Sequence, residues 1–387
     1  MIAAIILTLA TALAFYILIG YPLLLALMRH PVSPAVRKDT EFLPTVTVLM
    51  AVYNGAAFLK RKLEYLLNLD YPRELMDIIV ISDGSTDSTD QIAADFADQG
   101  VRLLPVPKGG KARALNAALP LATGQILFFT DVRQPLEISC LRHLVANFAD
   151  PTVGAVSGEM RLLKGDNGEQ ADMDLYWRYE IWARKKHTEI DSLFSATGCV
   201  YAMRRELAAT LPPDTLSDDV ALPQRAFFQG YRIILDPEAI AYDYPTKSGA
   251  EFQRRTRTLA GVWQVFLRSP MLFRKKRMRW HFLSHRFGRL VLPWTLIAIY
   301  LSTAALPNES WRNTMLLNEL FLPALALVDR FVPKGFLLKR LTSPARTFLV
   351  MNIAALAAMR VFFVPAEKLW NAPTAVSRAA VQPENQN

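Results

Sequence analysis

The pattern of hydrophobic and polar positions divides the chain into apolar ends and a middle in which strand and helix patterns alternate. Residues Ile2 to Met28 are apolar almost throughout, and no charged side chain precedes Arg29. A stretch of this length can cross a bilayer whose hydrocarbon core is about 30 Å thick. We therefore predict a transmembrane anchor over residues 1–28. A cleaved signal peptide is the alternative, but the positively charged start of such peptides is missing.

From Thr45 onward, short apolar runs alternate with patterns in which one helical face is apolar. The runs predict strands at 46–52, 78–82, 102–106, 126–131 and 153–157. Helical patterns lie between them; the first has its apolar face at residues 58–67, and Asn54 is predicted to cap it. Strands that alternate with helices predict an α/β fold with a doubly wound, mostly parallel sheet.

Carboxylates stand at the ends of several predicted elements. The run ILFFT is followed at once by Asp131, Asp83 ends an earlier strand, and the pair Asp218–Asp219 precedes a helical pattern. Asp83 and the Asp218–Asp219 pair could simply cap helices. However, ligands bind at the sheet edge where parallel strands end, and a buried carboxylate there needs a metal or a hydrogen-bond donor. Together these positions predict a site for a charged, metal-bound ligand.

The pattern changes again after residue 262. Residues 263–289 mix aromatic and basic side chains, which is typical of an amphipathic segment at a membrane interface. Three apolar stretches that follow predict transmembrane helices at 290–306, 316–332 and 346–364. The middle one is the weakest because Glu319 and Asp329 interrupt it. The last residues, 371–387, form a polar tail.

Composition supports a soluble part joined to a membrane part: 52% of the residues are hydrophobic, 20% are charged, and the mean hydropathy is +0.16. The net charge of +9 is concentrated, because residues 254–289 hold eleven Lys or Arg and residues 252–308 hold no acidic residue. A basic stretch beside apolar runs indicates a cytoplasmic juxtamembrane segment and disfavours nucleic-acid binding. Cys140 and Cys199 provide no disulfide framework. The chain has no GxGxxG, Walker or HExxH motif.

Several stretches between residues 44 and 262 carry a resemblance to a known family. They are VTVLMAVYNGA (46–56), VISDGSTDST (80–89), GGKARALNAAL (109–119), FFTDVRQ (128–134), ATGCVYAMRR (196–205), LSDDVALPQRAFFQGYRIILDPEA (216–239) and EFQRRTRTLAG (251–261). In order and content they resemble a family 2 glycosyltransferase of the GT-A fold, in its membrane-anchored bacterial branch. The resemblance implies a cytoplasmic GT-A domain over residues 42–262.

The resemblance also implies roles at the matching positions. The residues implied to hold a UDP-sugar are Ala51, Tyr53, Asn54, Asp83, Lys111, Asp131, Arg133, Arg254 and Arg257. Asp131 matches the first Asp of the family's DxD motif and would also bind a divalent metal ion, Mg²⁺ or Mn²⁺. Asp218 and Asp219 match the catalytic ED motif, with Asp219 as the base, and Gly198 and Cys199 match the acceptor-side loop.

Two departures from the family pattern change the expectation. Arg133 replaces the second Asp of DxD, so a metal ligand is missing or comes from elsewhere, and Arg133 itself could counter the charge of the diphosphate. In the QxxRW motif, which falls on residues 254–258, only the Arg at position 257 remains. Processive synthases of this family hold their growing chain near the Trp of that motif. Its absence favours the transfer of one or a few sugars.

We therefore predict an inverting membrane glycosyltransferase that moves a sugar from a UDP-sugar to a lipid-linked or glycan acceptor, for the synthesis of cell-surface polysaccharide or glycolipid. Its predicted place is the bacterial inner membrane, with several spans and a cytoplasmic catalytic domain. Predicted partners are the donor, the acceptor, membrane lipids and proteins of export or assembly, but not nucleic acid. The alternatives are a processive polysaccharide synthase, a polyprenyl-phosphate sugar synthase and, from another class, a catalytically silent scaffold that binds nucleotide sugars.

Overall fold

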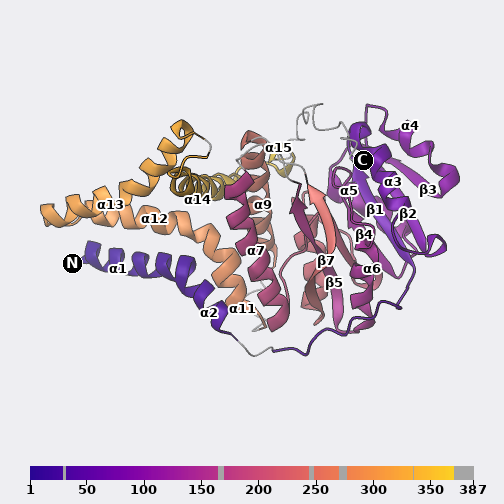
Figure 1. Ribbon diagram of the computed structural model, residues 1–387, viewed down its shortest axis with the longest axis horizontal. Coiled ribbons are helices and arrows are strands. Elements are labelled where there is room, and N and C mark those ends of the chain that lie inside the picture. Colours follow the sequence, from indigo (N-terminus) through magenta and orange to yellow (C-terminus); the bar gives the residue numbers. More distant parts are fainter. Residues whose placement is uncertain (29–31, 164–169, 244–247, 270–276, 334, 370–387) are drawn as a thin grey trace. The chain divides into compact units, whose positions relative to one another are not determined.

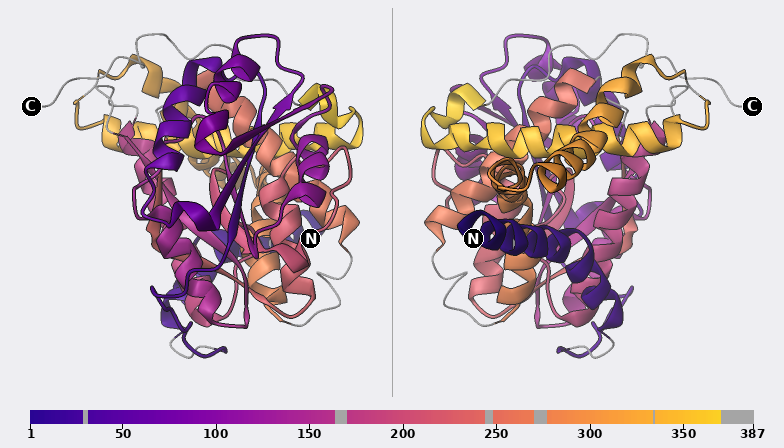
Figure 2. Two further views of the ribbon diagram at one scale, coloured as in Figure 1. Left: turned by 90° about the vertical axis from the view of Figure 1, so that its right-hand side faces the viewer. Right: turned by 90° about the vertical axis from the view of Figure 1, so that its left-hand side faces the viewer.

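The computed structural model describes residues 1–28, 32–163, 170–243, 248–269, 277–333 and 335–369. The chain divides into two compact units, which we describe separately (Figures 1 and 2). The sheet unit comprises residues 31–164, 187–246 and 364–387. The helical unit comprises residues 1–30, 165–186 and 247–363.

The sheet unit is built on a seven-stranded sheet with the strand order β3-β2-β1-β4-β6-β5-β7 (Figure 1). Its strands are β1 (Val46–Val52), β2 (Met76–Asp83), β3 (Val101–Val106), β4 (Ile126–Thr130), β5 (Val153–Leu162), β6 (Val200–Arg204) and β7 (Arg232–Asp243). All neighbouring strands pair in parallel except that β6 is antiparallel to both β4 and β5. Nearly every residue of β1, β2 and β4 is buried, as expected for central strands covered on both faces.

The sheet is covered by α3 (Ala56–Leu67), α4 (Thr89–Ala94), α5 (Lys111–Ala118), α6 (Cys140–Ala146) and α8 (Asp218–Phe228). The helix α3 has a buried face formed by Leu59, Leu63 and Leu66, because residues three or four apart share one side of a helix. α5 packs against β1 and β2, whereas α6 and α8 pack against β5 and β7. The short connections between strands and helices therefore gather at the two ends of the sheet.

The predicted α/β fold with a mostly parallel sheet is confirmed, and each predicted strand is present, although the strand predicted at 153–157 continues to Leu162. The prediction that Asn54 caps the first helix is wrong. Gly55 precedes α3, while Asn54 has a left-handed φ of 49° and its side chain accepts a hydrogen bond of 2.8 Å from the Thr86 backbone N–H. Asn54 thus joins two turns at the sheet edge.

The strands β6 and β7 were not predicted. β7 contains Asp236-Pro237, a pair of residues that is typical of turns. A proline is tolerated here because Pro237 lies between Asp236 and Ile240, where the pairing of β7 with β5 is interrupted. β5 and β7 also change register between Gly158 and Glu159. The local sequence pattern therefore did not predict β7, which is a strand because it pairs with β5.

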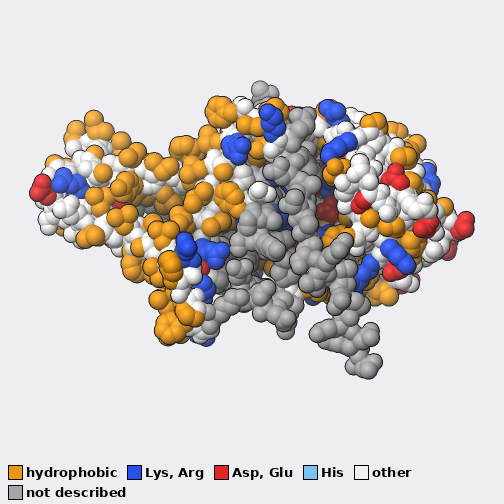
Figure 3. Space-filling view, turned by 90° about the horizontal axis from the view of Figure 1, so that it is seen from above, with side chains coloured by type: hydrophobic (Ala, Val, Ile, Leu, Met, Phe, Trp, Pro, Cys, Tyr) orange, Lys and Arg blue, Asp and Glu red, His pale blue; other side chains and the backbone are white. Residues whose placement is uncertain are grey.

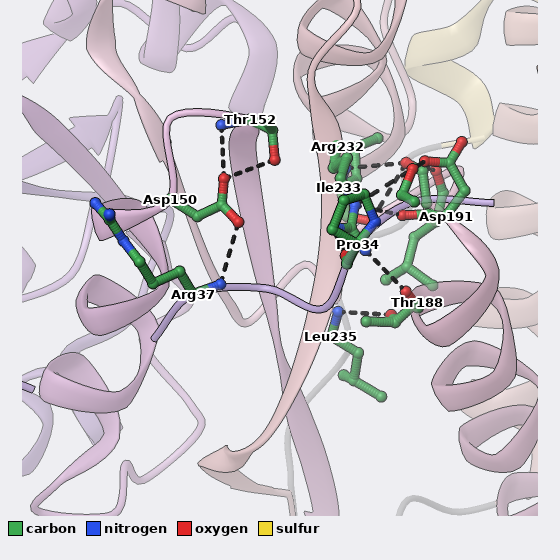
Figure 4. Close-up of polar contacts among 12 residues, drawn as sticks. Pro34, Arg37, Asp150, Thr152, Thr188, Asp191, Arg232, Ile233 and Leu235 are labelled. Carbon is green, nitrogen blue, oxygen red and sulfur yellow. Dashed lines mark hydrogen bonds and ion pairs between the residues drawn. The ribbon is translucent and has the colours of Figure 1, made fainter. Parts of the chain in front are cut away.

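Polar contacts within the sheet unit hold the segment that precedes β1 (Figure 4). The Arg232 side chain donates hydrogen bonds to the backbone carbonyls of Pro34 at 2.7 Å and of Asp191 at 2.8 Å. The Arg37 backbone N–H donates to the Asp150 carboxylate at 3.1 Å. Because Arg232 is buried, these bonds satisfy a cation that would otherwise be costly. The segment before β1 is thereby fixed to Arg232 at the start of β7.

The helical unit contains helices from three separate stretches of the chain. They are α1 (Ile2–Phe15), α2 (Tyr21–Leu27), the first part of α7 (Gln170–Ile190), α9 (Ser248–Arg268), α11 (Arg279–His281), α12 (Gly288–Ala304), α13 (Glu309–Val328) and α14 (Lys339–Ala357). Single π-helical segments, Tyr16–Gly20 and Phe282–Phe287, make α1–α2 and α11–α12 continuous. α1 packs along α12, and the hydroxyls of Tyr16 and Ser284 are hydrogen-bonded at 2.6 Å.

Three helical stretches in the described part of the chain are long and apolar enough to cross a membrane: Ile2–Leu27, Arg279–Ala304 and Lys339–Phe362. Hydrophobic side chains cover most of the visible face of the helical unit in Figure 3. The predicted span at 316–332 falls largely on α13, which is not among the three, and it stays a prediction. The predicted interfacial segment 263–289 is divided between α9 and the helix that begins at Arg279, with residues outside the described part between them.

Candidate active site

The candidate site lies in the sheet unit, at the edge where β1, β2 and β4 end. These strands are neighbours and parallel, so the residues that follow their carboxyl ends meet at one edge. Tyr53 follows β1, Asp83 ends β2 and Asp131 follows β4. The predicted gathering of strand-end carboxylates is therefore present in the structure.

Asp83 holds the loop that leads into α5. Its carboxylate accepts hydrogen bonds from the backbone N–H groups of Gly109, at 2.7 Å, and of Gly110, at 2.9 and 3.1 Å. Gly84 follows with a φ of +64°, and a Cβ at this position would lie 2.7 Å from the Lys108 backbone nitrogen. A side chain at position 84 would thus displace the loop. Asp83 positions the start of α5, and its predicted contact with a nucleotide stays a prediction.

The predicted nucleotide side also contains an aromatic–cation pair. The Lys108 ammonium lies 3.8 Å from the centre of the Tyr53 ring, close enough for a cation–π interaction. Ala51 and Tyr53 are half-buried and Asn54 is exposed. Part of this region is therefore open to solvent, as a binding surface for a nucleotide requires.

Lys111 occupies the centre of the site. Its ammonium lies 2.9 Å from Asp131 Oδ1 and 3.1 Å from Asp218 Oδ1, so it forms an ion pair with both carboxylates. Burial lowers the pKa of Lys111, but the negative charges of Asp131, Asp218 and Asp219 outweigh burial and raise it above its ordinary value. Lys111 therefore stays protonated at neutral pH. The Asp131 side chain remains 39% exposed, which leaves it accessible to a ligand.

Asp218 is held from the other side by Tyr201. The Tyr201 hydroxyl donates a hydrogen bond of 2.9 Å to Asp218 Oδ2, and its ring stacks on Phe129 of β4 with a centroid distance of 4.6 Å. Burial, together with the charge of Asp218, raises the pKa of Tyr201 well above its usual range, so the hydroxyl remains a donor. Both oxygens of Asp218 therefore have partners, which indicates that this carboxylate positions Lys111.

Asp219 has a different environment from its neighbour. Both residues lie in the first turn of α8, where the helix dipole favours negative charge, but Asp218 is buried and Asp219 is half-buried. A Cβ on Gly198 would lie 3.2 Å from Asp219 Oδ2, so the loop at Gly198 borders this carboxylate directly. The Asp219 backbone carbonyl also accepts a 2.8 Å hydrogen bond from the Ala196 N–H. The acceptor-side loop predicted from the sequence and the predicted base are thus adjacent.

Cys199 contributes backbone to this loop. Its carbonyl accepts a hydrogen bond of 2.9 Å from the Thr130 hydroxyl, at the end of β4. Burial raises the pKa of the Cys199 thiol, which therefore stays protonated at neutral pH. A protonated, buried thiol is a poor nucleophile, so Cys199 contributes its backbone carbonyl rather than its thiol.

Arg133, which replaces the second Asp of the DxD motif, has a partner of its own. It donates hydrogen bonds of 2.7 and 2.9 Å to the two carboxylate oxygens of Asp243, a residue that is 1% exposed at the end of β7. Gln134 donates to the same carboxylate at 3.1 Å. The charge of Arg133 is therefore largely compensated, which weakens the idea that it counters a diphosphate. The pair instead joins the turn after β4 to β7.

The remaining predicted residues are Arg254 and Arg257. They lie on α9 in the helical unit, and both are half-buried. Their predicted contacts with a donor stay predictions. Conversely, the contacts in the sheet unit reveal three residues that the sequence analysis missed, namely Lys62, Tyr201 and Asp243. Tyr201 and Asp243 lie on strands that were not predicted, and Lys62 lies among leucines on α3.

The protein side chains of the site could hold a divalent ion only together with oxygen atoms from a ligand. In the described part of the chain, no group of three His, Cys, Asp or Glu residues is arranged to hold a metal ion. Mg²⁺ is commonly bound by one or two carboxylates together with substrate phosphates. Asp131, with its exposed carboxylate, fits the role of such a single protein ligand.

Comparisons with known proteins identify the class of fold first. The solved structure of the mannosyltransferase PcManGT from Pyrobaculum calidifontis, in complex with GDP-Man and Mn²⁺, is 25% identical in sequence and superposes with a TM-score of 0.75. The likeness covers 94% of this chain and 99% of that one, so it includes helices as well as the sheet unit. The predicted GT-A fold is confirmed.

The family follows from sequence. Residues 47–211 match the family model Glycosyl transferase family 2, so this part of the chain carries a domain of that family. The beta-monoglucosyldiacylglycerol synthase of Nostoc sp. is 28% identical over 284 residues, which are 69% of this chain and 58% of the relative. The probable glycosyltransferase YdaM of Bacillus subtilis is 26% identical over 263 residues, 64% of this chain and 62% of the relative. The match to the family model ends before Asp218 and Asp219.

Proposed function

We propose that this chain is an inverting glycosyltransferase that moves one or a few sugars from a nucleotide-diphosphate sugar to a lipid-linked or glycan acceptor at a membrane. The arrangement of Lys111, Asp131 and Asp219 is the observation that carries this proposal. One half-buried cation lies beside a carboxylate whose side chain is 39% exposed, and a second accessible carboxylate borders the Gly198 loop. The match of residues 47–211 to glycosyl transferase family 2 and the GT-A fold support the same reaction.

The chemistry assigns a role to each group. An acceptor hydroxyl beside Gly198 would attack the anomeric carbon while Asp219 takes its proton as general base. The bond from that carbon to the diphosphate oxygen breaks, and the electron pair leaves with the diphosphate. Lys111 would stabilise the charge that develops there. A single displacement of this kind inverts the anomeric carbon.

A divalent ion shared with the diphosphate would supply further neutralisation of the leaving group. Asp131 is the residue of this chain that would contact it. The Asp131 carboxylate is paired with Lys111. An ion held by Asp131 and the diphosphate would therefore lie beside the Lys111 ammonium.

The acceptor is the less determined half of the reaction. Three helical stretches with the length and composition of membrane spans support an acceptor at a lipid surface. The name of the Nostoc relative, a beta-monoglucosyldiacylglycerol synthase, supports diacylglycerol as one candidate. We therefore propose a lipid or lipid-linked acceptor on the cytoplasmic side of a bacterial inner membrane.

The test is nucleotide release by the purified full chain in nanodiscs. UDP-glucose, UDP-N-acetylglucosamine and GDP-mannose would be offered with diacylglycerol, polyprenyl phosphate or a bacterial lipid extract, with Mg²⁺, Mn²⁺ or EDTA. Turnover with one donor, with an inverted linkage in the product, is the expected result. Asp219→Asn should lower kcat by about a hundredfold to ten-thousandfold, because a general base contributes that much.

Asp98→Asn is the matched control, because Asp98 is an exposed carboxylate on a short turn before β3. It should retain wild-type turnover. Tight nucleotide binding without turnover for any donor and acceptor would instead favour the silent scaffold. Repeated additions to one acceptor would favour a processive synthase.

A further inference from the structure

Lys62 is a buried cation that the proposed chemistry does not use. It lies on the apolar face of α3 beside Leu59, Leu63 and Leu66, and it is 1% exposed. Among the residues that the structure describes, Lys62 forms no ion pair with a carboxylate. Burial lowers the pKa of Lys62 to about 8, so it remains mostly protonated at pH 7. Burying an ammonium without a paired carboxylate costs free energy, so we expect Lys62 to have a function that offsets this cost.

The contacts of Lys62 lie directly behind the candidate site. Its ammonium donates hydrogen bonds of 2.7 Å to the Thr130 hydroxyl and of 2.6 Å to the Gln134 backbone carbonyl. These two acceptors flank the turn that carries Asp131 and Arg133. One buried side chain therefore holds both ends of that turn.

The same contacts extend to the acceptor-side loop. The Thr130 hydroxyl accepts from Lys62 and uses its own hydrogen to donate to the Cys199 carbonyl at 2.9 Å. Cys199 follows Gly198, the residue beside the Asp219 carboxylate. A continuous chain of hydrogen bonds thus joins α3, the end of β4 and the loop next to the proposed base.

We infer that Lys62 is a positioning residue of the transfer site, which sets the Asp131 turn and ties it through Thr130 to the acceptor-side loop. The inference rests on the proposed function, because it assigns donor binding to the turn and acceptor binding to the loop. The Asp131 turn and the acceptor-side loop must keep their relative positions, since small displacements of reacting groups lower rates steeply. A side chain that only filled the core beside the three leucines would not need an ammonium.

The test compares Lys62→Met, Thr130→Val, the double variant and Lys60→Met in the full chain. Methionine retains most of the length of lysine without its charge, and Lys60 is an exposed lysine on the same helix. Lys62→Met should lower kcat by about tenfold to a hundredfold while the KM for the donor changes much less. Thr130→Val should cause part of this loss, and the double variant should be no worse than Lys62→Met, because both remove one chain of contacts.

Hydrogen exchange supplies a readout that does not depend on turnover. In Lys62→Met, exchange should accelerate in peptides that cover residues 128–136 and 196–204, and Lys60→Met should match the wild type. Unchanged kcat and exchange in Lys62→Met would overturn the inference, as would an even rise of exchange across the whole sheet unit. If Lys62→Met does not fold, Thr130→Val provides the test: faster hydrogen exchange in residues 196–204 would support the inference, and unchanged exchange there would overturn it. A wild-type chain without turnover would refute the proposed function, whereas the exchange comparison would still test Lys62.

Discussion

Two clusters of charged side chains, one in each unit, differ in how much of their charge is compensated and exposed. In the sheet unit, Lys111 lies between Asp131 and Asp218, with Asp219 nearby, so carboxylates outnumber the cation. The Asp131 side chain is 39% exposed, and Asp219 is half-buried. This cluster keeps negative charge and accessible oxygen atoms at the end of the sheet.

The helical unit surrounds one acid with basic side chains. Glu180 of α7 is hydrogen-bonded to Arg289, and its carboxylate lies 3.5 Å from Arg286 and 3.6 Å from His285. The Glu180 side chain is only 7% exposed. Burial raises the pKa of Glu180, but the charges of Arg289, Arg286 and His285 outweigh it and hold that pKa well below its usual range.

The difference in charge compensation and exposure indicates that the first cluster is suited to binding a ligand and the second to stabilising the fold. Buried charges stabilise a fold only when partners and hydrogen bonds compensate them, as around Glu180. A site that must take up a charged substrate instead keeps groups whose compensation is incomplete and whose atoms reach solvent. Substitutions in the first cluster should therefore change rates, and substitutions in the second should change stability.

Between the two clusters, the larger expected effect on rate comes from Lys111, the cation of the first cluster. Lys111→Met removes the cation that would stabilise the departing diphosphate, and kcat/KM should fall by about a hundredfold to a thousandfold. Steady-state kinetics with the preferred donor measures this, and Lys60→Met is the exposed control. A value of kcat/KM within a few-fold of the wild type would show that the cluster does not take part in catalysis.

Glu180→Gln tests the second cluster. It removes the charge that compensates the half-buried Arg286 and Arg289, and the free energy of unfolding should fall by about 3 kcal/mol. Thermal unfolding in detergent measures the loss, and turnover per folded molecule should stay at the wild-type level. Glu309→Gln is the matched control, because the Glu309 side chain in the same unit is 82% exposed. Lost turnover without lost stability would reverse the distinction between the clusters.

The pH dependence of stability should come from the same carboxylate. The pKa of Glu180 is lower in the folded chain than its ordinary value of 4.5. Its contribution is therefore complete above that value and is lost as the pH falls toward the folded pKa. The midpoint of thermal unfolding should decrease below about pH 5 in the wild type and decrease less in Glu180→Gln. Parallel decreases in both proteins would assign the acid sensitivity to other groups.

The smallest effect is expected from a surface pair. Arg142 and Asp70 form hydrogen bonds of 2.8 and 3.0 Å, but the Asp70 side chain is 53% exposed. Asp70→Asn should change the free energy of unfolding by less than about 1 kcal/mol, since solvent and salt screen exposed pairs. Chemical denaturation at low and high salt measures it. A change as large as that of Glu180→Gln would mean that geometry, rather than burial, sets the difference between the clusters.

The sequence predicted the parts of the fold that repeat locally. The strand of Ile126 and the helix of Leu59 follow from runs and spacings that extend over a few residues, and the structure contains both. The antiparallel strand β6 lacked such a signal, because its place between β4 and β5 depends on pairing with distant residues. Asn54 was misplaced for a related reason: its side chain bonds to Thr86 rather than to its own helix.

By itself, the sequence determined the α/β class, the apolar segments and the carboxylates at Asp83, Asp131 and Asp219, because strand ends and apolar runs are local features. Only the tertiary structure decided which charges meet. It paired Lys111 with two acids, gave Arg133 the partner Asp243 and placed Lys62 behind the Asp131 turn. Each of these contacts joins residues at least twenty positions apart in the sequence, so no local pattern encodes it. Burial by the assembled sheet then determines how strongly each charge needs its partner.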